Sequence, residues 1–253
     1  MTILVTRPEP DGTALCHALQ QQGMTAIAQP LLNIEAGAQL PLLAKMLQTL
    51  QSGDYIIAVS ARSVEYAHQQ LASCGLSWPE GINYVAVGQK TAHSLEQSTL
   101  QAVHYPTHSD SEHLLKHPIL HSVAGKNVLI LRGNGGRELI YDTLQQRNAN
   151  VEYCETYRRQ WLTLDGEQLV LDWRRRNVNT IVITSSEQLQ YLTDLIPVQH
   201  TNWLYSCRLL VPSRRIANRA TELGFSLIST VGSAANAALL STLSDLKHDG
   251  TFE

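Results

Sequence analysis

The segment ILVTRPEPDGTALCHALQQQGMTAIA (residues 3–28) and the segment VLILRGNGGRELIYDTLQQRNANVEY (residues 128–153) have the same pattern of apolar and polar residues. Each begins with a short apolar run, continues with apolar residues at helical spacing, and ends in a second apolar run. Short β-branched runs on either side of a helical pattern indicate a β-α-β unit with parallel, covered strands. This unit occurs twice and decides the fold.

One offset of 125 residues relates five pairs of predicted strands. The paired positions are 3 and 128, 26 and 151, 56 and 181, 84 and 209, and 102 and 227. Gly23 and Asn148 correspond as well, and both residue types tolerate the left-handed conformation that ends a helix. Any two α/β halves alternate strands and helices in a similar way, which is the alternative explanation of the correspondence. A single offset without gaps favours an internal duplication instead. We predict strands at 3–6, 26–30, 55–59, 84–87 and 102–105, and again at 128–131, 151–154, 180–184, 209–211 and 227–229.

Composition limits the kind of protein. A chain of 253 residues with 43% hydrophobic content predicts two domains of moderate size. A net charge of -3 gives no general attraction to nucleic acid or to an anionic membrane. The sequence shows no basic and apolar leader pattern and no apolar run near the roughly 18 residues that span a bilayer, so we expect a cytoplasmic protein. Four widely spaced cysteines suit a reducing compartment rather than a zinc or dithiol site.

The junctions that follow the predicted strands are small, hydroxylic or cationic. Ligands of parallel sheets bind beyond the carboxyl ends of the strands, where helix starts offer free N–H groups and arginine or lysine adds charge. We therefore expect a polyanion receptor in a cleft between the two domains, although helix capping and solvated arginines are the ordinary alternative for each position. The candidate substrate-binding residues are Thr6, Arg7, Ser60, Ala61, Arg62, Gly88, Lys90, Thr91, Arg132, Gly133, Asn134, Gly135, Arg137, Thr184, Ser185, Ser186 and Ser213.

The sequence gives little support for a nucleotide site, a hydrolase nucleophile or a metal site. A dinucleotide fingerprint starting at Gly133 would need glycine at position 138, which is Glu138, and no G-K-[ST] phosphate loop occurs. No G-x-S-x-G nucleophile elbow is present. His113, His117 and His121 are spaced four apart, but Pro118 interrupts the helix that would align them, so we expect no metal site.

Several motifs together resemble one known family. They are ILVTRP (3–8), PLL (30–32), VSARSVEYA (59–67), YVAVGQKTAHSL (84–95), ILRGNGGRELIYDTLQQRNANVEYCETYRR (130–159) and IVITSSEQL (181–189). Their order and spacing are similar to bacterial uroporphyrinogen-III synthases over essentially the whole chain, and RGNGGREL with ETYRR is the most diagnostic part. One departure is VPSRR (211–215), where relatives often have glycine followed by Thr-Ala. Ser213 is therefore a weaker candidate.

The resemblance implies two flavodoxin-like α/β domains with parallel sheets, joined by a two-stranded β linker. In such proteins the first two strands pack with the C-terminal set. On this sequence the first domain would comprise residues 1–34 with 160–253, and the second would comprise residues 35–159. The offset of 125 residues by itself favours contiguous halves, but for the domain bounds we follow the resemblance.

The resemblance also implies a reaction in haem biosynthesis, the closure of hydroxymethylbilane to uroporphyrinogen III with inversion of the terminal pyrrole and loss of water. The implied enzyme is a monomeric, cofactor-independent lyase that has transient contact with hydroxymethylbilane synthase. Tyr157 matches a tyrosine that is proposed to assist departure of the hydroxyl, and a tyrosine ordinarily carries its proton at neutral pH. The alternative for Tyr157 is a packing role in the linker.

Two other functions stay open on the sequence. A non-enzymatic receptor for a small anion would share the duplication and the basic strand ends, and a two-domain glycosyltransferase would be recognised by tight binding of a nucleotide sugar.

Overall fold

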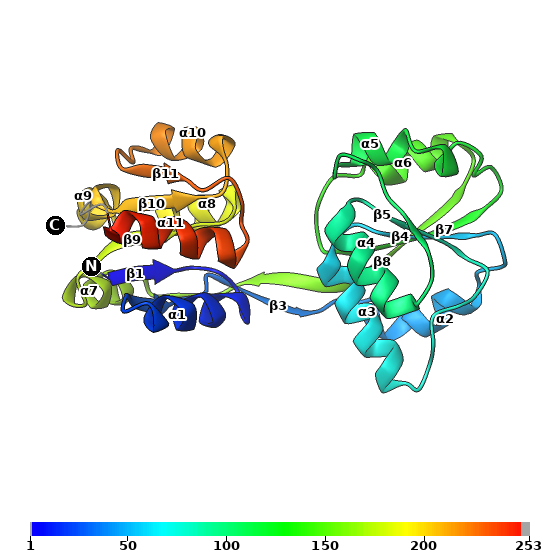
Figure 1. The fold of residues 1–253 in the computed structure, drawn as a ribbon, viewed down its shortest axis with the longest axis horizontal. Helices are drawn as coiled ribbons and strands as arrows, with labels where there is room; N and C mark the ends of the chain where they lie inside the picture. Colours follow the sequence, from blue (N-terminus) through cyan, green and yellow to red (C-terminus); the bar gives the residue numbers. More distant parts are fainter. Residues whose placement is uncertain (1, 249–253) are drawn as a thin grey trace. The chain divides into compact units, whose positions relative to one another are not determined.

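The computed structural model describes residues 2–248, with His248 described by its backbone only. The chain forms two compact units (Figure 1). Unit 1 comprises Met1–Asn33 and Gln160–Glu253, and unit 2 comprises Ile34–Arg159. Ile34 thus belongs to the second unit, one residue earlier than the sequence boundary placed it. Residues 249–253, which the expected first domain includes, lie outside the described residues.

Unit 1 is a parallel sheet covered on both faces. Its strand order is β11-β10-β9-β1-β2, with β1 Thr2–Val5, β2 Thr25–Ala28, β9 Val178–Val182, β10 Arg208–Val211 and β11 Ile228–Thr230. Helices α1 (Asp11–Gln21) and α11 (Asn236–His248) cover one face. The other face is covered by α7 (Gly166–Arg175), α8 (Ser186–Leu195), α9 (Thr201–Ser206) and α10 (Arg214–Leu223), with a short 3₁₀ turn at Val198–His200.

Unit 2 repeats this layering with strand order β3-β8-β7-β4-β5-β6. The strands are β3 Leu32–Ala36, β4 Tyr55–Ala58, β5 Asn83–Ala86, β6 Val103–His104, β7 Asn127–Gly133 and β8 Asn150–Trp161. Helices α2 (Leu43–Gln48), α3 (Ala61–Ser73) and α4 (Gln89–Thr99) cover one face, and α5 (Ser111–Leu115) with α6 (Leu139–Gln146) cover the other. Short 3₁₀ turns occur at Leu40–Leu42 and Pro118–Leu120.

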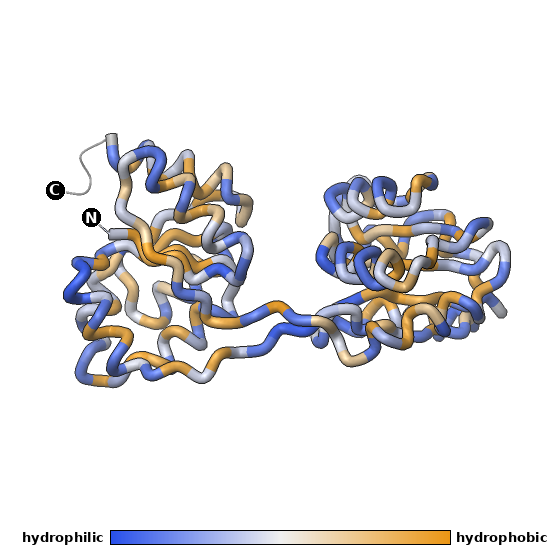
Figure 2. The backbone as a smooth tube through the Cα atoms, turned by 90° about the horizontal axis from the view of Figure 1, so that it is seen from below, coloured by the Kyte–Doolittle hydropathy of each residue, from blue (hydrophilic) through white to orange (hydrophobic). Residues whose placement is uncertain are grey.

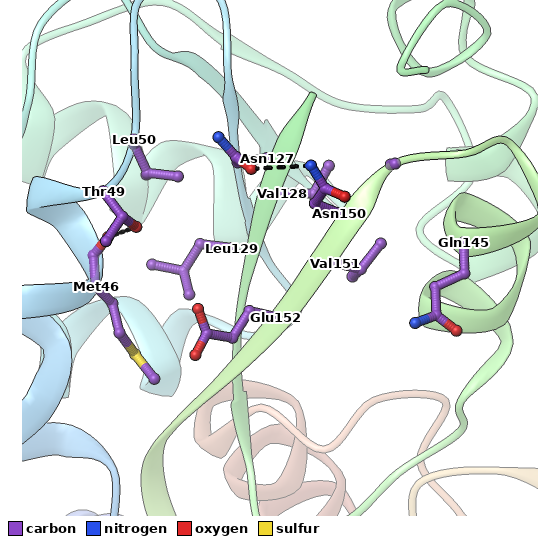
Figure 3. A pocket seen from close by; sticks show the side chains of 11 residues that line it. Met46, Thr49, Leu50, Asn127, Val128, Leu129, Gln145, Asn150, Val151 and Glu152 are labelled. Carbon is purple, nitrogen blue, oxygen red and sulfur yellow. Dashed lines mark hydrogen bonds between the residues drawn. The ribbon is translucent and has the colours of Figure 1, made fainter. Parts of the chain in front are cut away.

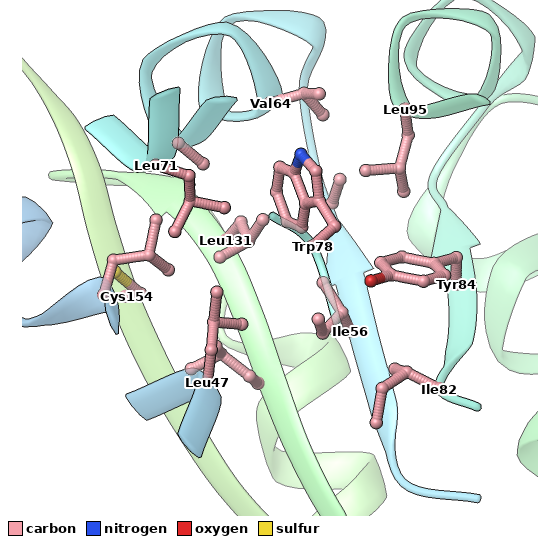
Figure 4. Packing of buried hydrophobic residues seen from close by; sticks show 14 of the residues in the cluster. Leu47, Ile56, Val64, Leu71, Trp78, Ile82, Tyr84, Leu95, Leu131 and Cys154 are labelled. Carbon is pink, nitrogen blue, oxygen red and sulfur yellow. The ribbon is translucent and has the colours of Figure 1, made fainter. Parts of the chain in front are cut away.

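Strand β4 shows why the central strands are apolar throughout. Alternate residues of a strand face opposite sides of the sheet. Ile56 therefore packs under α3 and α4, whereas Tyr55 and Ile57 pack under α5 and α6. Beside Ile56, the Trp78 ring meets the Tyr84 ring edge-on with 6.1 Å between centroids (Figure 4). The apolar stretches of the chain accordingly lie along the strands within each unit (Figure 2).

The two sheets have the same registers after a shift of 125 residues, which confirms the duplication. Ile3 pairs with Ala26 in unit 1, and Val128 pairs with Val151 in unit 2. The pairs Ile56 with Tyr84 and Ile181 with Leu209 correspond in the same way. All ten predicted strands are present. Gly23 and Asn148 both have a positive φ, of 69° and 60°, which confirms the predicted left-handed helix ends.

The equivalent strands, however, are not taken from contiguous halves of the chain. Strands β1 and β2 lie in the sheet with β9, β10 and β11, while β7 and β8 complete the sheet of β4, β5 and β6. With β1, β2, β9, β10 and β11 numbered 1 to 5, unit 1 has the flavodoxin-like order 2-1-3-4-5. Unit 2 has the same order when β7, β8, β4, β5 and β6 are numbered 1 to 5, with β3 as an additional strand beside β8. The contiguous halves that the offset alone favoured are therefore wrong. The unit β1-α1-β2 joins one sheet through the pairing of β1 with β9, and the unit β7-α6-β8 joins the other through the pairing of β7 with β4.

Strands β3 and β8 are the two chain segments that cross between the units, and β3 is the neighbour of β8. The turn after β3 lies close to β8, because the Gly37 N–H donates to the Thr156 carbonyl over 3.0 Å. A Cβ atom at residue 37 would lie 2.0 Å from the Glu155 carbonyl oxygen, so only glycine fits there. This contact holds the stretch of β8 that carries Tyr157.

Candidate functional site

Strand β4 of unit 2 ends at the start of a long helix. Ser60 is in an extended conformation, and its Oγ accepts a hydrogen bond from the Ser63 N–H over 3.1 Å, which caps α3. Thirteen residues of helix then direct the positive end of their dipole toward this edge of the sheet. Ser185 caps α8 of unit 1 in the same way, through the Gln188 N–H over 3.1 Å.

Tyr157 lies against this edge from β8. Its side chain is buried, with 7% of the residue exposed, and its hydroxyl oxygen accepts a hydrogen bond from Ser60 Oγ over 3.4 Å. The ring lies directly against Gly133, the last residue of β7. Tyr66 of α3 is a further aromatic neighbour, with 6.1 Å between ring centroids. The structure thus brings together three predicted site residues, Ser60, Gly133 and Tyr157.

Arg132 has a structural role that sequence reasoning missed. The residue is buried, its Nη1 pairs with Glu138 over 3.0 Å, and its guanidinium lies 4.3 Å from the centre of the Tyr153 ring. Tyr153 also donates a hydrogen bond to Glu138, and burial followed by this hydrogen bond raises the pKa of Tyr153 above its ordinary value. Arg132 therefore links the end of the loop 133–138 at Glu138 to Tyr153 of the sheet.

The rest of the 133–138 loop is also held by contacts within unit 2. Asn134 bonds with the backbone of Arg159 in both directions, accepting the N–H over 2.8 Å and donating to the carbonyl over 3.2 Å. Arg137 donates two hydrogen bonds to Glu112, which lower the pKa of that carboxyl. Gly135 is exposed, and a Cβ atom there would meet no other atom within 4 Å. Its backbone is thus accessible to a ligand.

The remaining candidates of unit 2 differ in accessibility. Arg62 is partly exposed and pairs with Glu65 over 3.1 Å, and Ala61 is the first residue of α3. Gly88 precedes α4 in extended conformation and is packed against the Ser109 side chain. Lys90 is exposed on the first turn of α4, whereas Thr91 is buried. Of these, Lys90 and the partly exposed Arg62 are the cations that can meet an anion.

In unit 1, several predicted side chains bond within the unit. Thr6 is completely buried and donates its hydroxyl proton to the Val182 carbonyl over 2.7 Å, so its side chain cannot meet a ligand. Arg7 donates to the Ala234 carbonyl and pairs with Asp11 over 3.1 Å. Arg7 stands 125 residues before Arg132, and the two arginines have the same kind of anchoring role.

The other candidates of unit 1 follow β9 and β10. Thr184 Oγ1 donates to Gln188 over 2.9 Å, and Ser186 Oγ accepts from Arg215 over 3.2 Å. Ser213 is the residue before α10 and makes no side-chain capping bond. The partly exposed hydroxyls of Ser186 and Ser213 therefore remain accessible beside the cation of Arg215.

Two pockets of unit 2 lie at opposite ends of its strands. One of about 460 Å³ is at the amino ends of β7 and β8, lined by Asn127, Asn150, Glu152 and apolar side chains of β7 and α2 (Figure 3). Its lining holds no lysine or arginine, and Glu152 would repel an anion. The other, of about 120 Å³, is at the carboxyl ends and includes Arg132, Gly135 and Arg137. Charge favours the carboxyl end for a polyanion.

Within residues 2–248, no three His, Cys, Asp or Glu side chains are grouped so that they could hold a metal ion. Helix α5 ends at Leu115, and His117 precedes the 3₁₀ turn that begins at Pro118, so His113 and His117 are not on one helix. In the same residues, no helix combines the length and the apolar character needed to cross a bilayer.

The fold and these strand ends define a class, that of two-unit flavodoxin-like α/β proteins with hydroxylic and cationic loops at the carboxyl edges of their sheets. Comparison with known proteins gives the particular family. The family model described as uroporphyrinogen-III synthase HemD matches residues 14–240. The uroporphyrinogen-III synthases of Salmonella typhimurium and Escherichia coli are each 44% identical over 245 residues, which is 96% of this chain and 100% of theirs. The chain belongs to the uroporphyrinogen-III synthase family, whose members are enzymes of tetrapyrrole synthesis.

Solved structures agree on the fold. A uroporphyrinogen III synthase from Thermus thermophilus aligns with a TM-score of 0.67 at 18% identity, covering 98% of this chain and 99% of that chain. The enzyme from Helicobacter pylori aligns with a TM-score of 0.58 at 13% identity, covering 97% and 99%. At these identities the similarity concerns the fold, so the role of each residue rests on its own geometry.

Proposed function

We propose that this protein closes hydroxymethylbilane to uroporphyrinogen III, with inversion of the terminal pyrrole ring and loss of water. The observation that carries the proposal is the Tyr157 hydroxyl at the carboxyl edge of β4 and β7, 3.4 Å from Ser60 Oγ. It occurs in a chain that is 44% identical over 245 residues to enzymes of that name. The proposed class is a lyase that needs no cofactor.

The proposed role of Tyr157 is to donate a proton to the departing hydroxyl group of the substrate. The carbon–oxygen bond breaks, water leaves, and electrons from the pyrrole nitrogen stabilise the azafulvenium cation. The far ring then attacks through its substituted carbon, and the spiro intermediate fragments and closes again with that ring reversed. The proton lost as the new ring becomes aromatic returns to the Tyr157 oxygen, so the balance is one bilane to one macrocycle and one water.

The substrate's carboxylates need partners, which the accessible loops supply. In unit 2 we propose the backbone of Gly135, the N-terminal amides of α3 at Ala61, and the side chains of Arg62 and Lys90. In unit 1 we propose the same role for Ser186 and Ser213. Uncatalysed closure of the bilane gives the symmetrical isomer. The proposed contacts must therefore orient the two ends of the bilane in addition to binding its carboxylates. Arg132, Thr6 and Thr91 act through the scaffold.

We propose that the protein acts as a monomer in the cytoplasm and receives substrate through transient contact with hydroxymethylbilane synthase. Four free cysteines, three of them buried, are compatible with a reducing compartment. Gel filtration with light scattering tests the monomer. A change in apparent size on mixing with the synthase tests the contact.

The test of function is the isomer that forms from porphobilinogen and hydroxymethylbilane synthase. Adding this protein should divert the product from uroporphyrinogen I to uroporphyrinogen III, measured by chromatography of the oxidised porphyrins. A receptor for small anions would leave isomer I unchanged, and that result would refute the proposal. Omitting the protein, or adding it after heat denaturation, serves as the control.

A further inference from the structure

Two small residues of unit 2 determine where the Tyr157 phenol lies. Along β7 and β8, Arg132 pairs with Glu155 but Gly133 pairs with Tyr157, so the register shifts by one residue at this point. The shift places the Tyr157 ring over the backbone of Gly133. A Cβ atom at residue 133 would lie 2.6 Å from Tyr157 Cζ and 3.0 Å from its hydroxyl oxygen, so any larger residue would force the phenol ring to shift.

The second residue, Ser60, holds the hydroxyl end of the ring. Ser60 Oγ accepts the Ser63 N–H over 3.1 Å and donates its single proton to the Tyr157 oxygen over 3.4 Å. The phenolic oxygen is therefore an acceptor in this contact, and its own proton is directed elsewhere. A separation of 3.4 Å is long for two hydroxyl groups, so the hydrogen bond can shorten and strengthen when negative charge develops on the tyrosine oxygen.

We propose that Ser60 and Gly133 are positioning residues for Tyr157, an inference that rests on the proposed function. Gly133 provides the space that sets the ring, and Ser60 leaves the phenolic proton available for the departing hydroxyl group. When Tyr157 gives up that proton, the Ser60 hydroxyl and the amino end of α3 stabilise the resulting phenolate. The proton returns to the same oxygen at ring closure.

The duplication supplies a matched control. Ser185 is 125 residues after Ser60 and caps its helix over the same 3.1 Å. The residues that correspond to Tyr157 and Gly133 in unit 1 are Leu32 and Pro8. Ser185→Ala thus removes a helix cap equivalent to that of Ser60, in a unit that has leucine instead of tyrosine at the position corresponding to Tyr157.

The experiment is a pair of double-mutant cycles read as kcat and KM of isomer III formation. Ser60→Ala should lower kcat about tenfold with KM nearly unchanged, and Ser60→Thr, which keeps the hydroxyl, should restore most of it. In a Tyr157→Phe background, Ser60→Ala should cause no further loss, because the group that it assists is gone. In the double variant of Ser185→Ala and Tyr157→Phe, the fold losses in kcat of the two single variants should multiply, whatever the size of the Ser185→Ala loss.

Gly133→Ala is the companion variant. We expect kcat to fall to about the level of Tyr157→Phe, again with no further loss in the double variant. If Gly133→Ala does not fold, the Ser60 cycle still decides. Equal fold losses for Ser60→Ala in both backgrounds would overturn the positioning role. Formation of isomer I alone by the wild-type protein would instead overturn the proposed function, so the two failures are distinguishable.

Discussion

Unit 1 and unit 2 have the same sheet but differ in what stands at its carboxyl edge. Their strand registers coincide after a shift of 125 residues, and so do two features of the edge. Ser60 and Ser185 cap equivalent helices, and Arg132 and Arg7 each pair with a carboxylate of the following segment. These repeated residues support the fold. The contacts that repeat at the edge therefore have a scaffold role, even where the residue types suggest ligand binding.

The residues that break the repeat point to chemistry. Tyr157 corresponds to Leu32, and Gly133 corresponds to Pro8, so the phenol and the space beneath it exist in unit 2 alone. Asp54 corresponds to Asn179, which makes the amino edge different as well. The comparison predicts that variants at unrepeated positions of the carboxyl edge affect turnover, whereas variants at repeated positions affect stability. Ser60 should affect both, because it is a repeated cap that also contacts the unrepeated Tyr157.

The largest effect is expected for Tyr157→Phe. Loss of a general acid typically costs about 10²–10⁴-fold in rate, so kcat for isomer III should fall at least about a hundredfold with little change in KM. Leu32→Met, at the equivalent buried position of unit 1, keeps side-chain volume and should leave kcat within about twofold. Steady-state kinetics measure both. If Tyr157→Phe turns over like the wild type, the tyrosine has only a packing role.

Arg132→Met should produce the next largest effect, on stability. It removes the ion pair with Glu138 and the contact with the Tyr153 ring, and we expect a loss of about 2 kcal/mol in the free energy of unfolding. Arg7→Met in unit 1 should cost a similar amount. Urea denaturation measures both variants. A large loss of substrate affinity without a loss of stability would instead show that Arg132 binds the substrate.

Asp54 should make unit 2 the more acid-sensitive of the two. Burial acts to raise the pKa of Asp54, but hydrogen bonds from the Gln51 N–H and from the Asn127 side chain and N–H outweigh it and lower the pKa. A carboxyl whose pKa is lower in the folded state contributes stability above its unfolded pKa of about 3.9, and this contribution is lost as pH falls through the folded value.

Asp54→Asn should therefore cost about 1–2 kcal/mol at pH 7 and have a smaller cost below about pH 3. Urea unfolding at several pH values measures the difference between variant and wild type. Asn179→Ala, at the equivalent position of unit 1, is the control, because it removes no carboxyl. A cost that is the same at every pH would show that the charge of Asp54 is not involved.

The smallest expected effect on stability is that of losing either helix cap. Ser60→Ala and Ser185→Ala should each lower the free energy of unfolding by about 1 kcal/mol, because each removes a single side-chain bond to an N–H of the first turn. Thermal and urea unfolding should give equal losses. A markedly larger loss for Ser60→Ala would mean that its contact with Tyr157 supports the fold.

Some site residues could be found from sequence because their position follows from local pattern. Ser60 comes directly after an apolar run and Gly133 one residue after another, and parallel strands present their carboxyl ends at one edge. The pairing of Arg132 with Glu138 was less visible, since a charged residue at a strand end is as compatible with a ligand as with a carboxylate. The burial of Thr6 depends on Val182, which is distant in sequence.

The sequence by itself determined the ten repeated strands, the helices between them, their left-handed ends at Gly23 and Asn148, and the duplication, because these depend on periodicity and on residues close together in the chain. That β1 and β2 join β9 was predicted by the family resemblance and not by any local pattern. Only the tertiary structure decided that Arg132 and Thr6 are satisfied internally, and that Tyr157 lies between Ser60 and Gly133. Those outcomes depend on the packing of segments far apart in sequence, for which no local pattern sets a register.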